Sequence, residues 1–411
     1  MQTRLAEFIR NTPQGEEADA ILRKCVHCGF CTATCPTYQL LGDELDGPRG
    51  RIYLIKQVLE GARATEKTRT HLDRCLTCRA CETTCPSGVH YSRLLDIGRA
   101  LVEEQAPRSI GGRLRRAAMR CGIANPGVFD LLLKTGQAVA PVLPRRLREI
   151  VPAPEPQTSW APLRHARRML ALDGCVQPSL APNINAAASR VLDAIGISLL
   201  RAPDAGCCGA VDFHLNAQDA ARARARRLID AWWPEVQAGI EAIVFTASGC
   251  GVMLKDYAHM LGQDDAYRAK AERITALCKD VSEVLHAERS RLLALPRDAA
   301  GPKRIALHAP CTLQHGLRLG PQTEQLLREL GFSLTAVPDA HLCCGSAGTY
   351  SILQPALALR LRGSKQAALR AGSPETVATA NIGCLAHLRH GMNVPVRHWI
   401  ELVADRIGRP R

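Results

Sequence analysis

The alternation of apolar and polar positions divides the 411-residue chain into a helical N-terminal part and a longer part of alternating strands and helices. Apolar residues at helical spacing predict helices over residues 16–24, 48–61 and 92–104, and shorter ones over 113–120 and 128–133. Short apolar runs predict strands over residues 169–172, 197–200, 242–246, 305–308, 333–337 and 376–379. The patterns indicate a multidomain fold, with an all-α domain followed by α/β domains.

The α/β part is a tandem repeat, because its cysteines recur at matching intervals. Cys175, the pair Cys207-Cys208 and Cys250 return as Cys311, the pair Cys343-Cys344 and Cys384. The first interval is 32 residues in both copies (175 to 207 and 311 to 343), and a glycine follows each pair. An internal duplication of this kind predicts two similar domains. Their cysteines should lie beyond the carboxyl ends of parallel strands, where such sheets build their sites.

These patterns predict four parts along the chain. They are an all-α, ferredoxin-like two-cluster domain over residues 1–106, a basic, proline-rich connector over 107–165, a first Cys-Cys-Gly domain over 166–300 and a second over 301–411. Two single cysteines, Cys121 in the connector and Cys278 in the first repeat, are expected to be small buried side chains.

The N-terminal part contains two Cys-x2-Cys-x2-Cys-x3-Cys-Pro runs, from Cys25 to Pro36 and from Cys75 to Pro86. This spacing is typical of a protein that holds two 4Fe-4S clusters, in which the fourth cysteine of each run binds the other cluster. The predicted ligands are Cys25, Cys28, Cys31 and Cys85 for one cluster, and Cys75, Cys78, Cys81 and Cys35 for the other. Zinc needs only four ligands and would leave the remaining cysteines of each run unused.

The cysteines of the repeats leave several chemistries open. An adjacent cysteine pair can form a redox-active disulfide, and four thiols can hold zinc or an iron-sulfur cluster of unusual shape. Ordinary buried cysteines are the simplest alternative, but pairs in matching glycine-flanked segments argue against it. A further cluster or metal is therefore predicted for Cys175, Cys207, Cys208 and Cys250, and for Cys311, Cys343, Cys344 and Cys384.

The net charge of +14 is unevenly distributed. Residues 101–170 carry 12 Lys/Arg against 5 Asp/Glu, which suggests an acidic partner or an anionic membrane surface. Nucleic-acid binding is disfavoured, since no helix-turn-helix or zinc-finger pattern occurs and only 4% of residues are aromatic. Neither an export signal nor an 18-residue apolar run is found, so we expect a cytoplasmic protein without a transmembrane segment, whose cysteines bind metal.

The two cluster runs followed by duplicated Cys-Cys-Gly domains resemble the iron-sulfur subunits of respiratory oxidoreductases. This group includes glycolate oxidase, anaerobic glycerol-3-phosphate dehydrogenase and relatives of heterodisulfide reductase. The similarity to the glycolate oxidase subunits is the greatest and covers nearly the whole chain. It is carried by the stretches Cys25 to Tyr38, Gly47 to Tyr53, Gly206 to Asp212 and His341 to Tyr350.

The resemblance implies the electron-transfer subunit of a 2-hydroxy-acid oxidoreductase, a glycolate dehydrogenase that makes glyoxylate. It also implies flavoprotein partner subunits that carry FAD, delivery of electrons to the quinone pool, and peripheral association with the inner membrane. The residues agree, because no Gly-x-Gly-x-x-Gly follows a predicted strand and no catalytic residue is expected in this chain. The alternatives are a related D-lactate or glycerol-3-phosphate dehydrogenase, or a Cys-Cys-Gly half that itself performs thiol or quinone chemistry.

One departure from the related family concerns the end of each repeat. There the family pattern closes in Cys-x2-Cys, whereas Met253 and His387 stand three residues after Cys250 and Cys384. Neither is expected to be a ligand, and the same holds for His214, His308 and His315. In the cluster loops, hydroxyl groups could donate hydrogen bonds to the sulfurs from Thr32, Thr34, Thr77 and Thr83.

Overall fold

The computed structural model describes residues 1–144, 148, 151–202, 204–298 and 301–407. Residues 145–147, 149–150, 203, 299–300 and 408–411, which fall in the predicted connector and repeats, lie outside the described residues. The chain forms two compact units. The first unit comprises Met1–Arg115 and Asp339–Lys365, and the second comprises Arg116–Pro338 and Gln366–Arg411.

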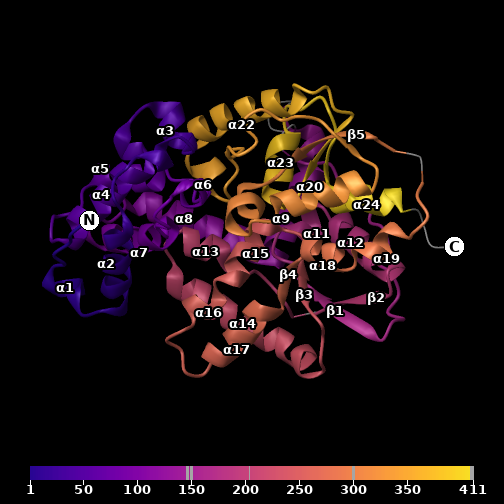
Figure 1. Ribbon diagram of the computed structural model, residues 1–411, viewed down its shortest axis with the longest axis horizontal. Helices are drawn as coiled ribbons and strands as arrows, with labels where there is room; N and C mark the ends of the chain where they lie inside the picture. The colour runs from indigo at the N-terminus through magenta and orange to yellow at the C-terminus, as the bar shows by residue number, and fades with distance from the viewer. Residues whose placement is uncertain (145–147, 149–150, 203, 299–300, 408–411) are drawn as a thin grey trace. The chain divides into compact units, whose positions relative to one another are not determined.

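The N-terminal part of the first unit is entirely helical in the described residues, as Figure 1 shows by its indigo and purple ribbons. Its elements are α1 (Glu7–Arg10), α2 (Pro13–Lys24), η1 (Phe30–Thr32), α3 (Pro36–Leu41), η2 (Glu44–Asp46), α4 (Pro48–Leu59), α5 (Glu66–Asp73), α6 (Ala80–Thr84) and α7 (Tyr91–Gln105). The three helices predicted here are confirmed as α2, α4 and α7.

Local sequence explains where these helices begin. The Thr12 hydroxyl accepts a hydrogen bond from the Gly15 amide at 3.1 Å, and Pro13 occupies the first turn of α2. The centre of this part is a close approach of α4 and α7. A Cβ atom on Gly98 of α7 would lie 2.6 Å from Cγ1 of Ile55 on α4, so only glycine permits this packing.

Two further helices follow, α8 (Ile110–Ile123) and α9 (Pro126–Val139), and then a 3₁₀ turn, η3 (Ala140–Val142). No residue of α8 or α9 is buried. The prediction that Cys121 is a buried side chain is therefore wrong, because it lies on the exposed surface of α8. A lone cysteine gives no indication of which helix face is covered.

The first repeat lies in the second unit. Its elements are β1 (Arg167–Ala171), α11 (Gln177–Leu180), α12 (Asn183–Ala194), β2 (Ile197–Arg201), α13 (Ala210–His214), α14 (Gln218–Gln237), β3 (Ile243–Phe245), α15 (Ser248–Lys255), α16 (Tyr257–Met260), α17 (Arg268–Leu277), β4 (Cys278–Asp280), α18 (Val281–Ala287) and α19 (Arg289–Leu293). Cys278 is fully buried, as predicted.

The second repeat follows the same order of strands. It contains β5 (Arg304–His308), the π-helical turn η4 (Thr312–Gly316), α20 (Gly320–Glu329), β6 (Ser333–Leu334), α21 (Tyr350–Leu353), α22 (Pro355–Arg370), β7 (Thr376–Thr379), α23 (Ile382–Arg389), β8 (Val396–His398) and α24 (Trp399–Arg406). The strand predicted over 333–337 is shorter than expected and ends at Leu334.

Each repeat builds a four-stranded sheet in which every pairing is parallel. The strand orders are β2-β1-β3-β4 and β6-β5-β7-β8, so the repeats share one topology. The six predicted strands are confirmed, and the prediction missed β4 and β8. The multidomain prediction of an all-α part followed by two α/β domains is confirmed.

The two repeats share a hydrophobic core. Met169 and Leu192 of the first repeat belong to the same buried cluster as Leu307 and Trp399 of the second, and α12 packs against α24. Burial of apolar surface at roughly 25 cal/mol per Å² stabilises both sheets together. In the described part of the chain, no helix combines the length and the apolar character that a membrane span requires.

Candidate metal centres

The two N-terminal cysteine loops adopt the same unusual backbone conformation. His27 and Gly29 in the first loop have φ of 54° and 85°, and Thr77 and Arg79 at the matching positions of the second have 51° and 59°. Left-handed φ is costly for residues other than glycine, so it persists only where the loop shape requires it. In the second loop this conformation lets the Thr77 amide donate to Cys75 Sγ at 3.4 Å.

The loops enclose two adjacent hollows in the first unit. The first is lined by Cys25, Cys28, Cys31 and Cys85, with Cys81 also on its wall. The second is lined by Cys35, Cys75, Cys78 and Cys81. Pro48, Cys81 and Tyr91 line both hollows, so the two spaces share a wall.

The fourth cysteine of each run lies at the end of a short helix. Cys35 caps the N-terminus of α3, and Pro36 occupies the first turn of that helix. Cys85 is the C-cap residue of α6, in extended conformation. Cys35 lines the hollow of the second run, and Cys85 lines the hollow of the first.

The pKa values of the cysteine thiols indicate whether these hollows suit a metal cluster. Burial, together with the neighbouring cysteines, raises the pKa of the Cys31 thiol to about 11. Burial also raises the pKa of the Cys81 thiol well above its usual range. Such crowded thiolates need cations beside them, and coordinated iron provides that charge. The donor sets therefore fit two 4Fe-4S clusters.

A buried charge network surrounds the second hollow. Arg51 is 1% exposed, contacts Asp46 at 3.4 Å and donates to the Thr37 hydroxyl at 3.1 Å. The Thr37 hydroxyl lies 3.3 Å from Cys35 Sγ, and the Tyr91 hydroxyl donates to Cys75 Sγ at 3.7 Å. Arg51 therefore brings a buried positive charge next to the second sulfur set.

The threonines predicted to donate to sulfur bond elsewhere. The hydroxyls of Thr32 and Thr77 donate to the backbone carbonyls of Gly29 and Leu76, both at 2.7 Å. Those of Thr34 and Thr83 donate to the Ala80 carbonyl. The hydroxyl beside Cys75 belongs to Tyr91, a residue that the sequence reading missed because it lies outside both cysteine runs.

The first repeat brings its four cysteines together in the second unit. Hydrogen bonds join Cys175 to Cys207, Cys207 to Cys208 and Cys208 to Cys250. The hydrogen bond from Cys175 and a second from Cys208 lower the pKa of Cys207, while the pKa values of its two neighbours rise. The result is one thiolate held among protonated thiols, an arrangement suited to metal binding or thiol chemistry.

The glycine after each cysteine pair has the same role in both repeats. Gly209 and Gly345 both have φ of 86°, and each amide donates at 3.4 Å to the first sulfur of its pair. A Cβ atom at Gly209 would lie 3.0 Å from the Ala221 carbonyl oxygen. The Cys-Cys-Gly motif therefore encodes a tight turn that directs an amide toward sulfur.

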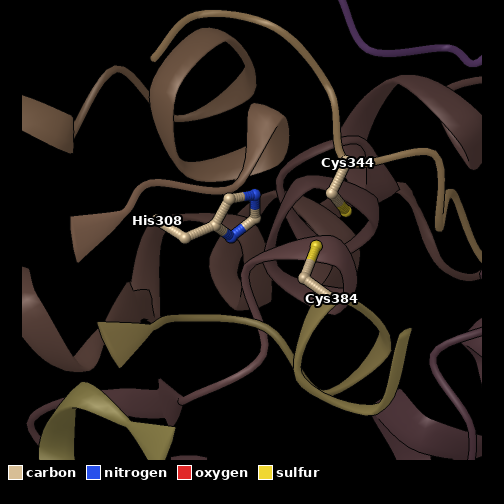
Figure 2. Close-up of side chains that lie close together, drawn as sticks. All are labelled: His308, Cys344 and Cys384. Atoms are coloured by element: carbon tan, nitrogen blue, oxygen red, sulfur yellow. The ribbon is translucent and has the colours of Figure 1, made fainter. Parts of the chain in front are cut away.

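In the second repeat, His308 ends β5 and Cys384 lies on α23 (Figure 2). Both are buried, and a ring nitrogen of His308 lies within 4.8 Å of Cys384 Sγ. The third side chain labelled in Figure 2, Cys344, belongs to the first unit together with Cys343. Cys311 directly precedes η4, and Cys250 and Cys384 correspond because each lies in the first turn of its helix, α15 or α23.

Met253 and His387 stand where the related family has the last cysteine of Cys-x2-Cys, and their surroundings differ. Met253 is buried in the core of the first repeat, among Leu254, Tyr257 and Ile274. This placement agrees with a packing role. His387 lies on α23, one turn after Cys384.

Comparison with known proteins identifies the family to which this chain belongs. Residues 21–89 match the 4Fe-4S dicluster domain, and residues 169–255 and 305–389 both match the cysteine-rich domain. The glycolate oxidase iron-sulfur subunit of Escherichia coli is 56% identical over 99% of both chains. A probable glycolate oxidase iron-sulfur subunit of Bacillus subtilis is 28% identical over 98% of this chain and 96% of its own.

Lactate utilization proteins are more distant and match only part of the chain. Lactate utilization protein A of Exiguobacterium is 23% identical over 57% of this chain and 95% of its own length. The high identity to the Escherichia coli protein over the full length of both chains, together with the dicluster and duplicated cysteine-rich domains, decides the assignment. This chain belongs to the family of glycolate oxidase iron-sulfur subunits.

Proposed function

We propose that this chain is the electron-transfer subunit of a flavin-dependent complex that oxidises glycolate to glyoxylate. A pair of 4Fe-4S clusters supplies one-electron transfer between a two-electron flavin and a quinone acceptor. The observation that carries the proposal is the pair of cysteine-lined hollows sharing Cys81, Pro48 and Tyr91 as a common wall.

The ligand assignment is part of the proposal. Cys25, Cys28, Cys31 and Cys85 hold one cluster, and Cys75, Cys78, Cys81 and Cys35 hold the other. Support comes from the lining of the two hollows and from the Thr77 amide, which donates to Cys75 Sγ. Cys81 lines both spaces, and its place in the second run assigns it to the second cluster.

The flavin and the substrate belong to partner subunits in this proposal. The name of the Escherichia coli relative describes a subunit of glycolate oxidase, and its identity over the full chain favours glycolate as the electron source. FAD would reside on those partners, because this sequence lacks a dinucleotide-binding glycine motif. The chain itself contributes the sulfur ligands and the charges around them.

The test is substrate-dependent reduction of the complex. The protein is isolated anaerobically with its native partners, and glycolate, D-lactate or glycerol 3-phosphate is added in turn. Electron paramagnetic resonance should show two interacting reduced clusters with glycolate and neither with glycerol 3-phosphate. Reduction by D-lactate alone would assign the chain to a lactate-oxidising complex, which the distant lactate utilization relatives make the foremost alternative.

The first repeat supports a second candidate, in which it performs thiol or quinone chemistry itself. The favouring observation is the thiolate of Cys207 among the thiols of Cys175 and Cys208. Replacement of Cys207 by serine separates the two functions. A pure relay keeps its activity with an artificial dye acceptor, whereas a catalytic repeat loses activity with dye and quinone alike.

We also propose that the chain associates with the cytoplasmic face of the inner membrane through α9. Val128, Leu131, Leu132 and Val139 are exposed at helical spacing on α9, and Val142 of η3 is exposed after them, in a segment with excess basic charge. Vesicles rich in phosphatidylglycerol should bind the complex, and a Leu131→Asp/Leu132→Asp variant should lose that binding. Equal binding of variant and wild type would remove α9 from the contact.

A further inference from the structure

The two repeats differ at corresponding positions beside their cysteines. Cys311 lies 136 residues after Cys175, so His308 corresponds to Leu172. Cys384 lies 134 residues after Cys250, so Thr379 and Asn381 correspond to Phe245 and Ala247. Leu172, Phe245 and Ala247 are all buried apolar residues. The second repeat thus has three polar side chains where the first has three apolar ones.

These polar residues are placed by the sheet. His308 is the last residue of β5 and pairs in register with Thr379, the last residue of β7. The Thr379 hydroxyl lies 2.9 Å from Nδ1 of His308, and His308 is 3% exposed. Because β5 and β7 are adjacent and parallel, their carboxyl ends direct both side chains to one edge of the sheet.

The fold alone does not require a buried histidine at this edge. Burial of a polar ring costs free energy even when one nitrogen is hydrogen-bonded. The first repeat builds the same sheet with Leu172 at this position, which shows that an apolar residue serves the packing. A chemical role in the second repeat explains the exchange.

The neighbours of His308 indicate that role. One of its ring nitrogens lies within 4.8 Å of Cys384 Sγ, and Asn381 Nδ2 donates to the same sulfur at 3.8 Å. Imidazole and thiolate form a donor set for zinc or iron, and metal-bound histidines commonly have their other nitrogen hydrogen-bonded. Thr379 provides that second hydrogen bond to His308.

We propose that His308 and Cys384 are ligands of one metal centre in the second repeat, with Thr379 orienting the imidazole and Asn381 donating to the thiolate. Cys311 is the further cysteine that the second repeat contributes within the same unit. The inference rests on the proposal that the repeats bind metal, and it makes the two sites chemically different. An imidazole in place of a thiolate raises the reduction potential of an iron-sulfur centre.

The experiment uses the full chain, purified anaerobically, and counts bound metal by native mass spectrometry. The main variant is His308→Leu/Thr379→Val, which introduces an apolar pair like that of the first repeat. Cys384→Ser removes the other ligand, and His308→Cys retains a donor atom. The matched control is His214→Leu, because His214 is an exposed histidine of the first repeat.

The wild type should carry one mass increment in the second repeat beyond two 4Fe-4S clusters. The apolar variant and Cys384→Ser should lose it, while His308→Cys and the control should keep it. Thr379→Val alone should retain the metal about tenfold more weakly, since it removes only the orienting hydrogen bond. The size of the increment distinguishes a zinc ion from an iron-sulfur cluster.

A second readout keeps the test valid if the apolar variant does not fold. In protein labelled with ¹⁵N-histidine, the reduced iron centre should show nitrogen hyperfine coupling that disappears in His308→Cys. For zinc, absorption at the zinc edge should show sulfur replacing nitrogen. Wild-type metal content in the apolar variant would overturn the proposal, and so would a wild type with no further increment. Loss of the 4Fe-4S masses themselves would instead overturn the proposed function.

Discussion

Arg51 is the clearest case of a single residue that tunes a site. Its guanidinium is buried beside the second sulfur set and contacts Asp46, which also binds Arg74 at 2.8 Å and His71 at 3.1 Å. Burial lowers the pKa of Arg51, but the nearby sulfurs of Cys75 and Cys35 and the carboxylate of Asp46 outweigh it and raise that pKa. The side chain therefore stays charged and stabilises added negative charge on that cluster.

Replacement of Arg51 by methionine should lower the reduction potential of the second cluster and leave the first nearly unchanged. We expect a shift on the order of 60 mV, which corresponds to a tenfold change in a one-electron equilibrium. Redox titration followed by electron paramagnetic resonance measures both potentials. The control replaces Arg49, a more exposed arginine that lines the first hollow. If the Arg51 variant shifted the reduction potentials of both clusters equally, the placement of Arg51 beside the second cluster would be contradicted.

At the residue scale, the sequence predicts what spacing encodes and misses what packing brings together. The eight cysteines of the two hollows stand in a recognisable order. Arg51 and Tyr91 reach the same hollow from helices α4 and α7, and no local pattern marks them. The burial of Cys121 was predicted wrongly for the same reason, because burial depends on which neighbour covers a helix face.

The junction of β3 and α15 illustrates how an element depends on one glycine. Gly251 faces the ring of Phe245, and a Cβ atom there would lie 2.0 Å from Cε2 of that ring. Since Phe245 is fully buried, the ring has little room to move. This contact holds the helix that carries Cys250 close to the sheet.

Gly251→Ala should destabilise the second unit by about 1–3 kcal/mol through overpacking. Gly127→Ala in α9 is the matched control, because nothing lies within 4 Å of its Cβ position. We expect that control to be neutral or stabilising by up to about 1 kcal/mol. Denaturant unfolding monitored by circular dichroism measures both, and equal stability of the two variants would refute the packing argument.

The junction of β8 and α24 gives a pH dependence. His398 caps α24 by accepting a hydrogen bond from the Ile400 amide at 3.2 Å, and its Nε2 donates to the Thr246 carbonyl at 2.9 Å. Burial lowers the pKa of His398 to about 4. The neutral ring is therefore required in the fold, since protonation would remove the accepting nitrogen.

The stability contributed by this neutral ring is fully present above about pH 6.5, the pKa of an unperturbed histidine, and is lost as the pH falls toward 4. The loss should approach about 1.4 kcal/mol per pH unit within that window. Hydrogen exchange of the α24 amides at pH 5 and 7.5 measures it. His398→Asn keeps a capping oxygen without titrating, and an unchanged pH dependence in that variant would contradict the mechanism.

At the element scale, the helices and the longer strands could be predicted from periodicity. The strands β4 and β8 could not, because each has three residues with a polar one at its centre, Lys279 and Arg397. Their pairing with β3 and β7 depends on the sheet already formed by the other strands. The duplication was visible in the cysteines and provides the clearest indication of equivalent topology.

At the scale of the whole molecule, one segment of the second repeat belongs to the unit that contains the dicluster hollows. Within that unit, the Tyr350 hydroxyl donates to the Arg74 carbonyl at 3.2 Å, and Arg360 donates to the Leu40 carbonyl at 3.1 Å. Burial raises the pKa of Tyr350, and Cys75 and Cys343 raise it further. Tyr350 therefore lies close to a cysteine of each kind of site.

This grouping could not be predicted from the sequence, in which residues 339–365 read as part of the second repeat. The contacts of Tyr350 and Arg360 join residues 276 and 320 positions apart, and no periodic pattern encodes such long-range packing. The domain boundaries proposed from composition remain a prediction, whereas the family and the fold class are established by the comparisons and the sheets.

The central claim is the crossed ligation of two neighbouring clusters, and one set of spectra tests it most directly. Cys28→Ala and Cys78→Ala each remove one cluster and define the spectrum of the other. Crossed ligation predicts that Cys85→Ala gives the Cys28→Ala spectrum and Cys35→Ala gives the Cys78→Ala spectrum by electron paramagnetic resonance. If Cys85→Ala instead reproduced the Cys78→Ala spectrum, each run would bind its own cluster, and the proposed arrangement of the relay would be wrong.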